Sequence, residues 1–458
     1  ENRFASFYGA LDYSLFDRYV LNVSFRTDGS NNFGSDEQFN PTWSAGAVWH
    51  VSEETFMEVV RPVLSRLSLR VATGYTGNIN KTVKPNLMMK YYKNFRISDD
   101  ENYRMGYINN APNPKLRWEK TRDVKVALDF GLWKDRINGI VEAYWRKSKD
   151  CVTSEYVPVT TGFFNQSYNT SVLQNNGVEF SLSVAVLKSK DYNLSVSANV
   201  AWNQNKLKKY NSPNTSLALD KYVGYPMGAV FSGKYEGIDP ETGMYKFKLR
   251  PDAVTNKDGY LREPNNYYYY LGTSVAPFTG GFNLNFSYKN IGLSVGGSYS
   301  VKAKMVDNIE SPAGYELLSG SKLESIPTPH NDLYRNHLNV KREVRNRWTP
   351  ENRTGVKYPR LIDAYGKKLG LDLTNPTLTT ITRGALLEDI SYLRINTIAL
   401  SYSLPQRVLE RINFSSAALN LTLNNFFTIT KYSGIDPEVP GATYPVSRSV
   451  TIGLNVGF

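Results

Sequence analysis

The sequence predicts an all-β protein, a transmembrane antiparallel β-barrel, and three observations lead to this prediction. Apolar and polar residues alternate with a period of two over segments of about ten residues, the length that a tilted membrane-spanning strand needs. No stretch approaches the roughly 18 uninterrupted apolar residues of a membrane-spanning helix. The connections between the segments are alternately short and long, as in outer-membrane barrels.

About thirteen segments show the alternation, and the last is the clearest. There Val450, Ile452 and Leu454 alternate with polar residues and glycine. The eleventh segment changes phase between Ile395 and Ile398, which predicts a β-bulge. The expected strands lie near residues 4–14, 18–28, 42–51, 66–76, 118–132, 136–148, 172–187, 192–205, 277–288, 291–303, 389–404, 415–428 and 447–458.

The lengths of the connections follow a regular order. Short links are expected around Asp17, at Lys134-Asp135, at 188–191 and at Lys289-Asn290, and long links at 28–41, 149–171, 206–276 and 304–388. Outer-membrane barrels have short periplasmic turns and long extracellular loops. The long links are therefore predicted to be extracellular, which leaves Phe458 on the periplasmic side.

A soluble β-sandwich also alternates, with its apolar face turned inward. Aromatic residues gather near the ends of the expected strands, where barrels carry their interfacial girdles. In a sandwich the same residues would fill the core. The placement of the long links at one end favours the barrel. The aromatic residues in question are Tyr13, Tyr19, Trp43, Trp49, Tyr75, Trp133, Trp145 and Trp202.

The odd number of expected strands predicts an incomplete barrel, because single-chain bacterial barrels close with an even number. Counting back from a periplasmic Phe458 places Glu1 on the extracellular side, in or beside a surface loop. We therefore expect the chain to be the second part of a larger barrel. Exposed loops are where proteolytic nicks concentrate, so a nicked or separately produced fragment is the hypothesis that fits.

The composition excludes several classes of protein. With 13% aromatic residues the chain is not intrinsically disordered, and with Cys151 as its one cysteine it has no disulfide framework. The formal net charge is +12, but Lys and Arg are dispersed, and the densest run, at 341–347, is short and interrupted. We therefore expect no nucleic-acid partner, whereas anionic lipid headgroups or an acidic ligand both fit the charge.

No catalytic residue, metal site or cofactor is expected. His50, His330 and His337 are scattered, which gives little support to a Ser-His-Asp arrangement or to a metal site with Cys151. The acidic run Asp99-Asp100-Glu101 lacks the ligand spacing of a calcium loop, so we expect a solvated charge run.

Six blocks in order along the chain carry a resemblance to a known family. Residues 391–405, with YLRI, IALSYSLP, and residues 424–438, with NNFFTITKY and GIDPE, are the most specific. The other blocks lie at residues 19–34, 116–131, 175–179 and 347–360. Together they resemble the SusC/RagA family of TonB-dependent transporters of Bacteroidota outer membranes. The terminal Phe458 is similar to the aromatic C-terminus by which outer-membrane barrels are recognised for insertion.

The resemblance implies a fold and a set of partners. The family barrel has about 22 strands around a plug. Residues 1–458 would be its C-terminal part, with long extracellular loops, and the plug and N-terminal strands would lie outside this chain. The partners implied are a SusD-like surface lipoprotein, the N-terminal plug-containing part, the TonB complex acting through that part, outer-membrane lipid, and a homodimer of transporter–lipoprotein pairs.

The function implied is active import of oligosaccharides or peptides across the outer membrane of a Gram-negative bacterium, by a multi-pass protein that is not an enzyme. The resemblance leaves the cargo class open. Two alternatives also remain: a passive porin or self-standing barrel, and a secreted β-rich glycan-binding module or adhesin.

Two sets of residues are candidates for the site. Tyr267, Tyr268, Tyr269 and Tyr270 have aromatic faces that stack on sugars or grip peptide side chains, although the same run also fits a loop that packs on itself or on a partner protein. Polar residues on the inward phase of the strands are expected to form a lumen network against the plug. They are Lys125, Asp129, Glu142, Arg146 and Glu179.

Overall fold

The computed structural model describes residues 3–78, 83, 85–98, 101–163, 165–210, 222–241, 243, 245–253, 266–306, 345–358, 383–440 and 444–458. The chain divides into two compact units. The first comprises Glu1–Met227 and Gly280–Leu293, and the second comprises Gly228–Thr279 and Ser294–Phe458. Within the described residues, every helix is too short or too polar to cross a membrane.

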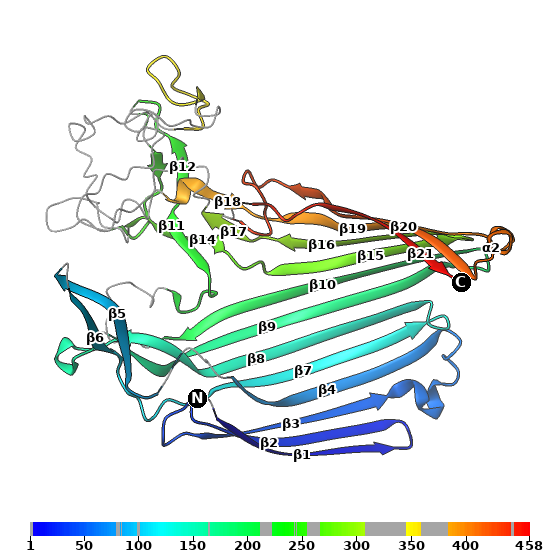
Figure 1. The fold of residues 1–458 in the computed structure, drawn as a ribbon, viewed down its shortest axis with the longest axis horizontal. Helices are drawn as coiled ribbons and strands as arrows, with labels where there is room; N and C mark the ends of the chain where they lie inside the picture. Colours follow the sequence, from blue (N-terminus) through cyan, green and yellow to red (C-terminus); the bar gives the residue numbers. More distant parts are fainter. Residues whose placement is uncertain are drawn as a thin grey trace. The chain divides into compact units, whose positions relative to one another are not determined.

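The main sheet has 13 strands, and their order in the sheet follows their order along the chain (Figure 1). All of the strands expected from the alternation are present. They are β1 (Phe4–Leu15), β2 (Tyr19–Ser30), β3 (Phe39–His50), β4 (Leu64–Asn78), β7 (Glu119–Leu132), β8 (Ile137–Tyr156), β9 (Asn165–Lys188), β10 (Tyr192–Lys209), β15 (Phe278–Tyr288), β16 (Ile291–Val301), β19 (Tyr392–Ser403), β20 (Ser416–Thr430) and β21 (Ser449–Gly457).

Two strands, β8 and β9, extend furthest beyond the bounds that the alternation predicts. The pairing of β8 with β9 continues as far as Tyr156 opposite Asn165, beyond the predicted limits of 148 and 172. Residues such as Thr153 and Ser154 are polar on both faces, so the apolar signal stops while the hydrogen-bonded ladder continues. The predicted length was therefore that of the apolar band and not that of the strand.

Two of the short connections are tight turns with consecutive residues in the left-handed region. Phe16 and Asp17 both have φ of 55° between β1 and β2, and Lys134 and Asp135 have φ of 60° and 61° between β7 and β8. Positive φ at both central residues matches the twist of the flanking strands. The link between β3 and β4 differs, because it contains two 3₁₀ turns, η1 (Val51–Glu53) and η2 (Thr55–Met57).

The apolar face of the first unit's sheet is exposed and its polar face is partly enclosed. On β7, Val124, Val126 and Leu128 share one face, while Asp123 and Lys125 lie on the other. Leu128 is 39% exposed, whereas Ala127, on the polar side, is 4% exposed. A soluble sheet has the opposite polarity, so this distribution is that of a lipid-facing wall.

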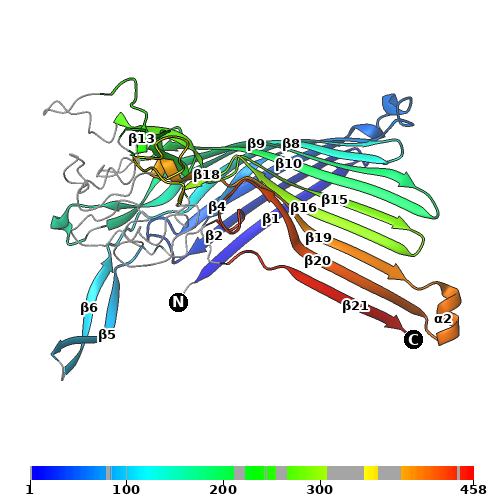
Figure 2. The ribbon, with the colours of Figure 1, turned by 90° about the horizontal axis from the view of Figure 1, so that it is seen from above.

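The long connections contain short strand pairs that the alternation did not predict. In the first unit β5 (Met88–Ser98) pairs with β6 (Glu101–Asn110), and this hairpin extends away from the main strands (Figure 2). In the second unit the small pairs are β11 (Ala229–Gly233) with β14 (Tyr268–Thr273), β12 (Tyr235–Ile238) with β13 (Tyr245–Phe247), and β17 (Lys304–Val306) with β18 (Leu387–Asp389). Within the part of the chain that the structure describes, the remaining helical elements are η3 (Val159–Thr161), η9 (Arg383–Leu386) and α2 (Gln406–Ile412).

The predicted bulge is present between β19 and β20. The register shifts between Ile395 and Thr397, which pair with Phe427 and Asn424. The extra residue lies on β20, where Asn425 has φ of 59°, although the phase change was read on β19. The bulge bends β20 and shifts that strand's own alternation, while β19 places the single residue Asn396 opposite it. The prediction was therefore right about the position of the bulge and wrong about the strand that carries it.

The turn at Asp17 gives a test of the backbone geometry. We expect Asp17→Val to lower the free energy of unfolding by about 1–2 kcal/mol, because a β-branched residue is strained in the left-handed region. Asp17→Gly, the matched control, is expected to leave it unchanged or raise it. The measurement is the urea midpoint of the barrel in detergent, and equal midpoints for the two variants would contradict the assignment of this turn.

Candidate functional site

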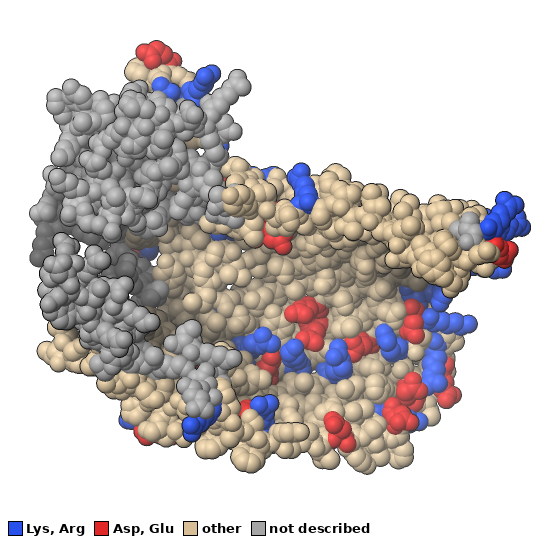
Figure 3. All heavy atoms as spheres, in the orientation of Figure 1, with Lys and Arg blue, Asp and Glu red and all other residues tan. Residues whose placement is uncertain are grey.

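Three ion pairs between neighbouring strands of the first unit form a band on its polar face. Arg70 on β4 binds Asp129 on β7 at 2.6 Å. Lys125 on β7 binds Glu142 on β8 at 3.1 Å, and Arg146 on β8 binds Asp123 on β7 at 2.8 Å. Figure 3 shows basic and acidic side chains next to one another in a band across this face. The charges in each pair neutralise each other, so these three pairs together carry no net charge.

The structure brings four of the five predicted lumen residues into this band: Lys125, Asp129, Glu142 and Arg146. Glu179 on β9 stands directly opposite Glu142, is exposed, and has no ion-pair partner among the described residues. Contact of any of these residues with a plug stays a prediction. Sequence reasoning missed Arg70 and Asp123, although each lies in the polar phase of its strand, a signal that could have identified them.

Neutral amides continue the polar face toward the long-link end. Tyr144 donates its hydroxyl hydrogen to Asn203 Oδ1 at 3.1 Å, and Asn205 Nδ2 donates to Asn175 Oδ1 at 2.7 Å. Gly177 is required between them, because a Cβ there would lie 2.4 Å from the Tyr144 hydroxyl and 2.5 Å from the carbonyl oxygen of Trp202. This part of the wall therefore offers hydrogen-bonding groups without net charge.

The tyrosine run belongs partly to β14 in the second unit. Tyr268, Tyr269 and Tyr270 pair with Gly233, Ser232 and Phe231 of β11. Tyr269 donates to the carbonyl oxygen of Leu249 at 2.8 Å, so its hydroxyl is used within the loop. Tyr270 is exposed and its ring contacts Phe231, while Tyr267 is half-buried. The run therefore packs within its own loop and presents one exposed ring, and its role in substrate binding stays a prediction.

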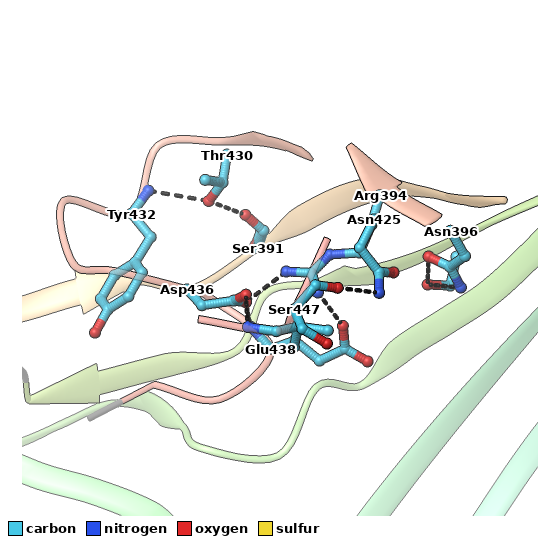
Figure 4. A network of polar contacts seen from close by, with 11 residues as sticks. Ser391, Arg394, Asn396, Asn425, Thr430, Tyr432, Asp436, Glu438 and Ser447 are labelled. Carbon is cyan, nitrogen blue, oxygen red and sulfur yellow. Dashed lines mark hydrogen bonds and ion pairs between the residues drawn. The ribbon is translucent and has the colours of Figure 1, made fainter. Parts of the chain in front are cut away.

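A buried charge cluster in the second unit joins β19 to the segment after β20 (Figure 4). The Arg394 side chain is 3% exposed, and it binds Asp436 at 2.5 Å and Glu438 at 2.8 Å. Asp436 also accepts hydrogen bonds from the backbone N–H groups of Glu438 and Val446, both at 3.0 Å. Three donor groups therefore make four contacts with two carboxylates, and these contacts fix the path of the chain between β20 and β21.

The pKa of Asp436 lies below its usual value. Burial alone would raise this pKa, but the N–H groups of Glu438 and Val446 and the Arg394 guanidinium stabilise the carboxylate more strongly. The segment around Asp436 carries part of the family resemblance, but the sequence alone gave Asp436 no role. His50 shares a hydrogen bond with Ser68, whereas His330, His337, Asp99, Asp100 and 341–344 lie outside the described residues.

The family model for the β-barrel of TonB-dependent receptor-like proteins matches residues 1–309. The chain belongs to this family. Its members are outer-membrane proteins of Gram-negative bacteria, and this TonB-dependent receptor chain is located in that membrane. Both the resemblance drawn from the six blocks and the predicted all-β barrel fold are confirmed.

Relatives align along nearly the whole receptor chain. It is 27% identical to the TonB-dependent receptor SusC of Bacteroides thetaiotaomicron, over 100% of this chain and 44% of SusC. It is 26% identical to the TonB-dependent receptor P26 of Formosa agariphila, over 99% of this chain and 46% of P26. The solved structure of the RagAB peptide transporter matches with a TM-score of 0.80 and 25% identity, over 100% of this chain and 48% of that one. The chain thus spans less than half the length of these relatives.

The buried cluster generates a stability prediction. Arg394→Met is expected to cost about 3–5 kcal/mol of unfolding free energy, because it leaves the buried Asp436 carboxylate without its cation. Lys125→Met, the matched control, breaks a pair whose lysine is 41% exposed and should cost no more than about 1 kcal/mol. Urea midpoints measure both, and similar losses would show that the Arg394 cluster is no more than a surface ion pair.

The lowered pKa of Asp436 predicts a pH dependence. Its carboxylate adds stability above the pKa of an unfolded Asp, about 3.9, and that stability is lost as the pH falls through the lower folded value. The difference in urea midpoint between the unmodified protein and Asp436→Asn should therefore shrink as the pH is lowered below about 4. A difference that stays constant from pH 7 to this range would contradict the prediction.

Proposed function

We propose that residues 1–458 form the C-terminal part of the barrel wall of a TonB-dependent active importer. The observation that carries the proposal is the match to the RagAB peptide transporter along the full chain, with a TM-score of 0.80. In this proposal the plug and the N-terminal strands lie outside this chain, and energy reaches the plug from the TonB complex. The wall itself performs no catalysis.

The proposed cargo is an oligosaccharide or a peptide. The polar face supports this class, since the three ion pairs of the band join neighbouring strands and the amides beside them, such as Asn175 and Asn203, are neutral. A wall of one sign would attract small ions of the opposite sign. Paired charges beside neutral donors and acceptors suit a large neutral or zwitterionic polymer.

The proposed partner is a SusD-like surface lipoprotein that closes the extracellular side. The folded connections of the second unit support such a contact. Trp348 is buried there and donates its indole N–H to the Pro240 carbonyl oxygen at 2.9 Å, which ties two distant segments together. A preformed surface loses less conformational entropy on binding than a flexible loop does. Two transporter–lipoprotein pairs would form the homodimer.

The rival functions make different physical demands. A passive porin would need an open lumen and no energy source, and a secreted glycan-binding module would need no lipid-facing wall. The exposed apolar face, with Leu128 and Val71 directed outward, supports the membrane protein over the secreted module. The dependence of cargo uptake on an energy source separates the importer from the porin.

The proposed function predicts uptake that depends on energy and on the full-length receptor. Cells that express the receptor are given fluorescent oligosaccharides and, separately, fluorescent peptides, with and without a proton-motive-force uncoupler. We expect accumulation of one class, and its loss with the uncoupler or on deletion of the receptor gene. Uptake that is insensitive to the uncoupler would assign the passive porin instead.

The receptor purified from the same cells checks the proposed architecture. Gel mobility and intact mass, measured before and after boiling, show whether this chain is bound to a second polypeptide that completes the barrel. A partner of similar size that separates on boiling, or one longer chain that includes this sequence, supports the incomplete barrel. A compact, heat-modifiable barrel of this chain alone would contradict it.

A further inference from the structure

An apolar groove of about 270 Å³ lies on the exposed face of β1–β4, in the first unit, toward the short-turn ends. Its lining consists chiefly of two rows of directly paired residues. The row nearer the turns is Leu15, Tyr19, Trp49 and Leu69, and the next is Tyr13, Leu21, Ala47 and Val71. The groove therefore runs from the end of the strands into the apolar face.

Ala47 creates the groove, because it is the one small side chain in its row. It stands between Leu21 on β2 and Val71 on β4, and its methyl group cannot fill the space that a larger residue would occupy. Val20 and Val48, which pair with each other between the two rows, complete the lining.

A polar cluster fixes the aromatic rim at the turn end of the groove. Glu54 accepts hydrogen bonds from the Tyr19 hydroxyl at 2.5 Å and from the Trp49 indole N–H at 3.1 Å. Its other carboxylate oxygen binds Arg18 at 3.2 Å. Tyr and Trp take such positions at the level of lipid headgroups, with the polar edge toward water and the ring toward hydrocarbon. The groove therefore begins at headgroup level and continues into the acyl region.

The charges and the adjoining turn indicate which lipid fits. The Arg18 guanidinium has five N–H donors and can bind a phosphate, while Asp17 next to it is exposed and acidic. Both signs beside one another suit a zwitterionic headgroup. The turn between β3 and β4 exposes Phe56 and Val59, at 64% and 88%, as an interfacial anchor would.

We propose that this groove binds one phospholipid of the periplasmic leaflet, a phosphatidylethanolamine. One acyl chain lies over Ala47 between Leu21 and Val71, and the phosphate binds Arg18. The short turns of outer-membrane barrels are periplasmic, which places the site in the phospholipid leaflet. The bound lipid holds the turn between β3 and β4 at the membrane surface. This site is independent of the cargo and of the proposed import.

The test uses the purified full-length receptor in detergent, with phosphatidylethanolamine added, and native mass spectrometry to count bound lipid. Ala47→Leu and Ala47→Trp fill the groove and are expected to weaken retention roughly tenfold, the effect of losing about two buried methylene contacts. Ala143→Trp is the matched control, because Ala143 is also an outward alanine between two valines, Val126 and Val178, on other strands. It should retain lipid as the unmodified protein does.

The headgroup contact is tested separately. Arg18→Gln is expected to weaken retention and Arg18→Lys to restore part of it, whereas Lys134→Gln, in another short turn, has no effect. Heat-modifiability on a gel confirms that each variant is folded. If Ala47→Trp does not fold, Ala47→Leu is used in its place. The proposal would be overturned if Ala47→Leu retained as much lipid as the unmodified protein, or if Ala143→Trp lost as much lipid as the Ala47 variants. Co-purification of a bound protein at this groove in place of lipid would also overturn it. Equal retention of phosphatidylglycerol would overturn the assigned headgroup.

Discussion

The hydrocarbon core of a bilayer offers no hydrogen-bond partner, and this constraint determines the arrangement of the chain. Each unpaired backbone group in that environment costs several kcal/mol, so the strands of the sheet pair with their neighbours in chain order. The same constraint reverses the polarity of the side chains. Leu128 and Val71 are exposed, while Asp129 and Lys125 lie on the enclosed face and are paired across strands.

The polar groups follow a second rule, since they must be satisfied by one another. In the band on β4, β7 and β8 each cation has a carboxylate on the adjacent strand. In the second unit, Arg394 gathers the carboxylates of a segment that leaves the sheet, so the wall and its connection are held by one cluster. Glu179 has no ion-pair partner among the described residues, and it is exposed, so water can solvate its charge.

The sequence was sufficient for the main sheet because period-two alternation is a direct effect of one apolar and one polar face. It also located the bulge near Ile395, since a phase change has few other causes. It did not predict the β11–β14 pair or the β5–β6 hairpin, which stand outside the apolar band and have no one-sided pattern. The pairing of Arg394 with Asp436, 42 residues away, depends on the folded path of the chain and leaves no local signal. The same applies to the choice of Arg70 as the partner of Asp129.

The paired extension of β8 and β9 has a consequence for the extracellular surface. Trp145 is exposed at the level of an aromatic girdle, and the ladder continues from there to Tyr156. At about 3.4 Å per residue and a tilt of about 40°, this part rises roughly 25–30 Å above the girdle. The paired extension is thus about as tall as the lipid core is thick. Any polymer that approaches this side of the wall meets folded protein well before it reaches the membrane.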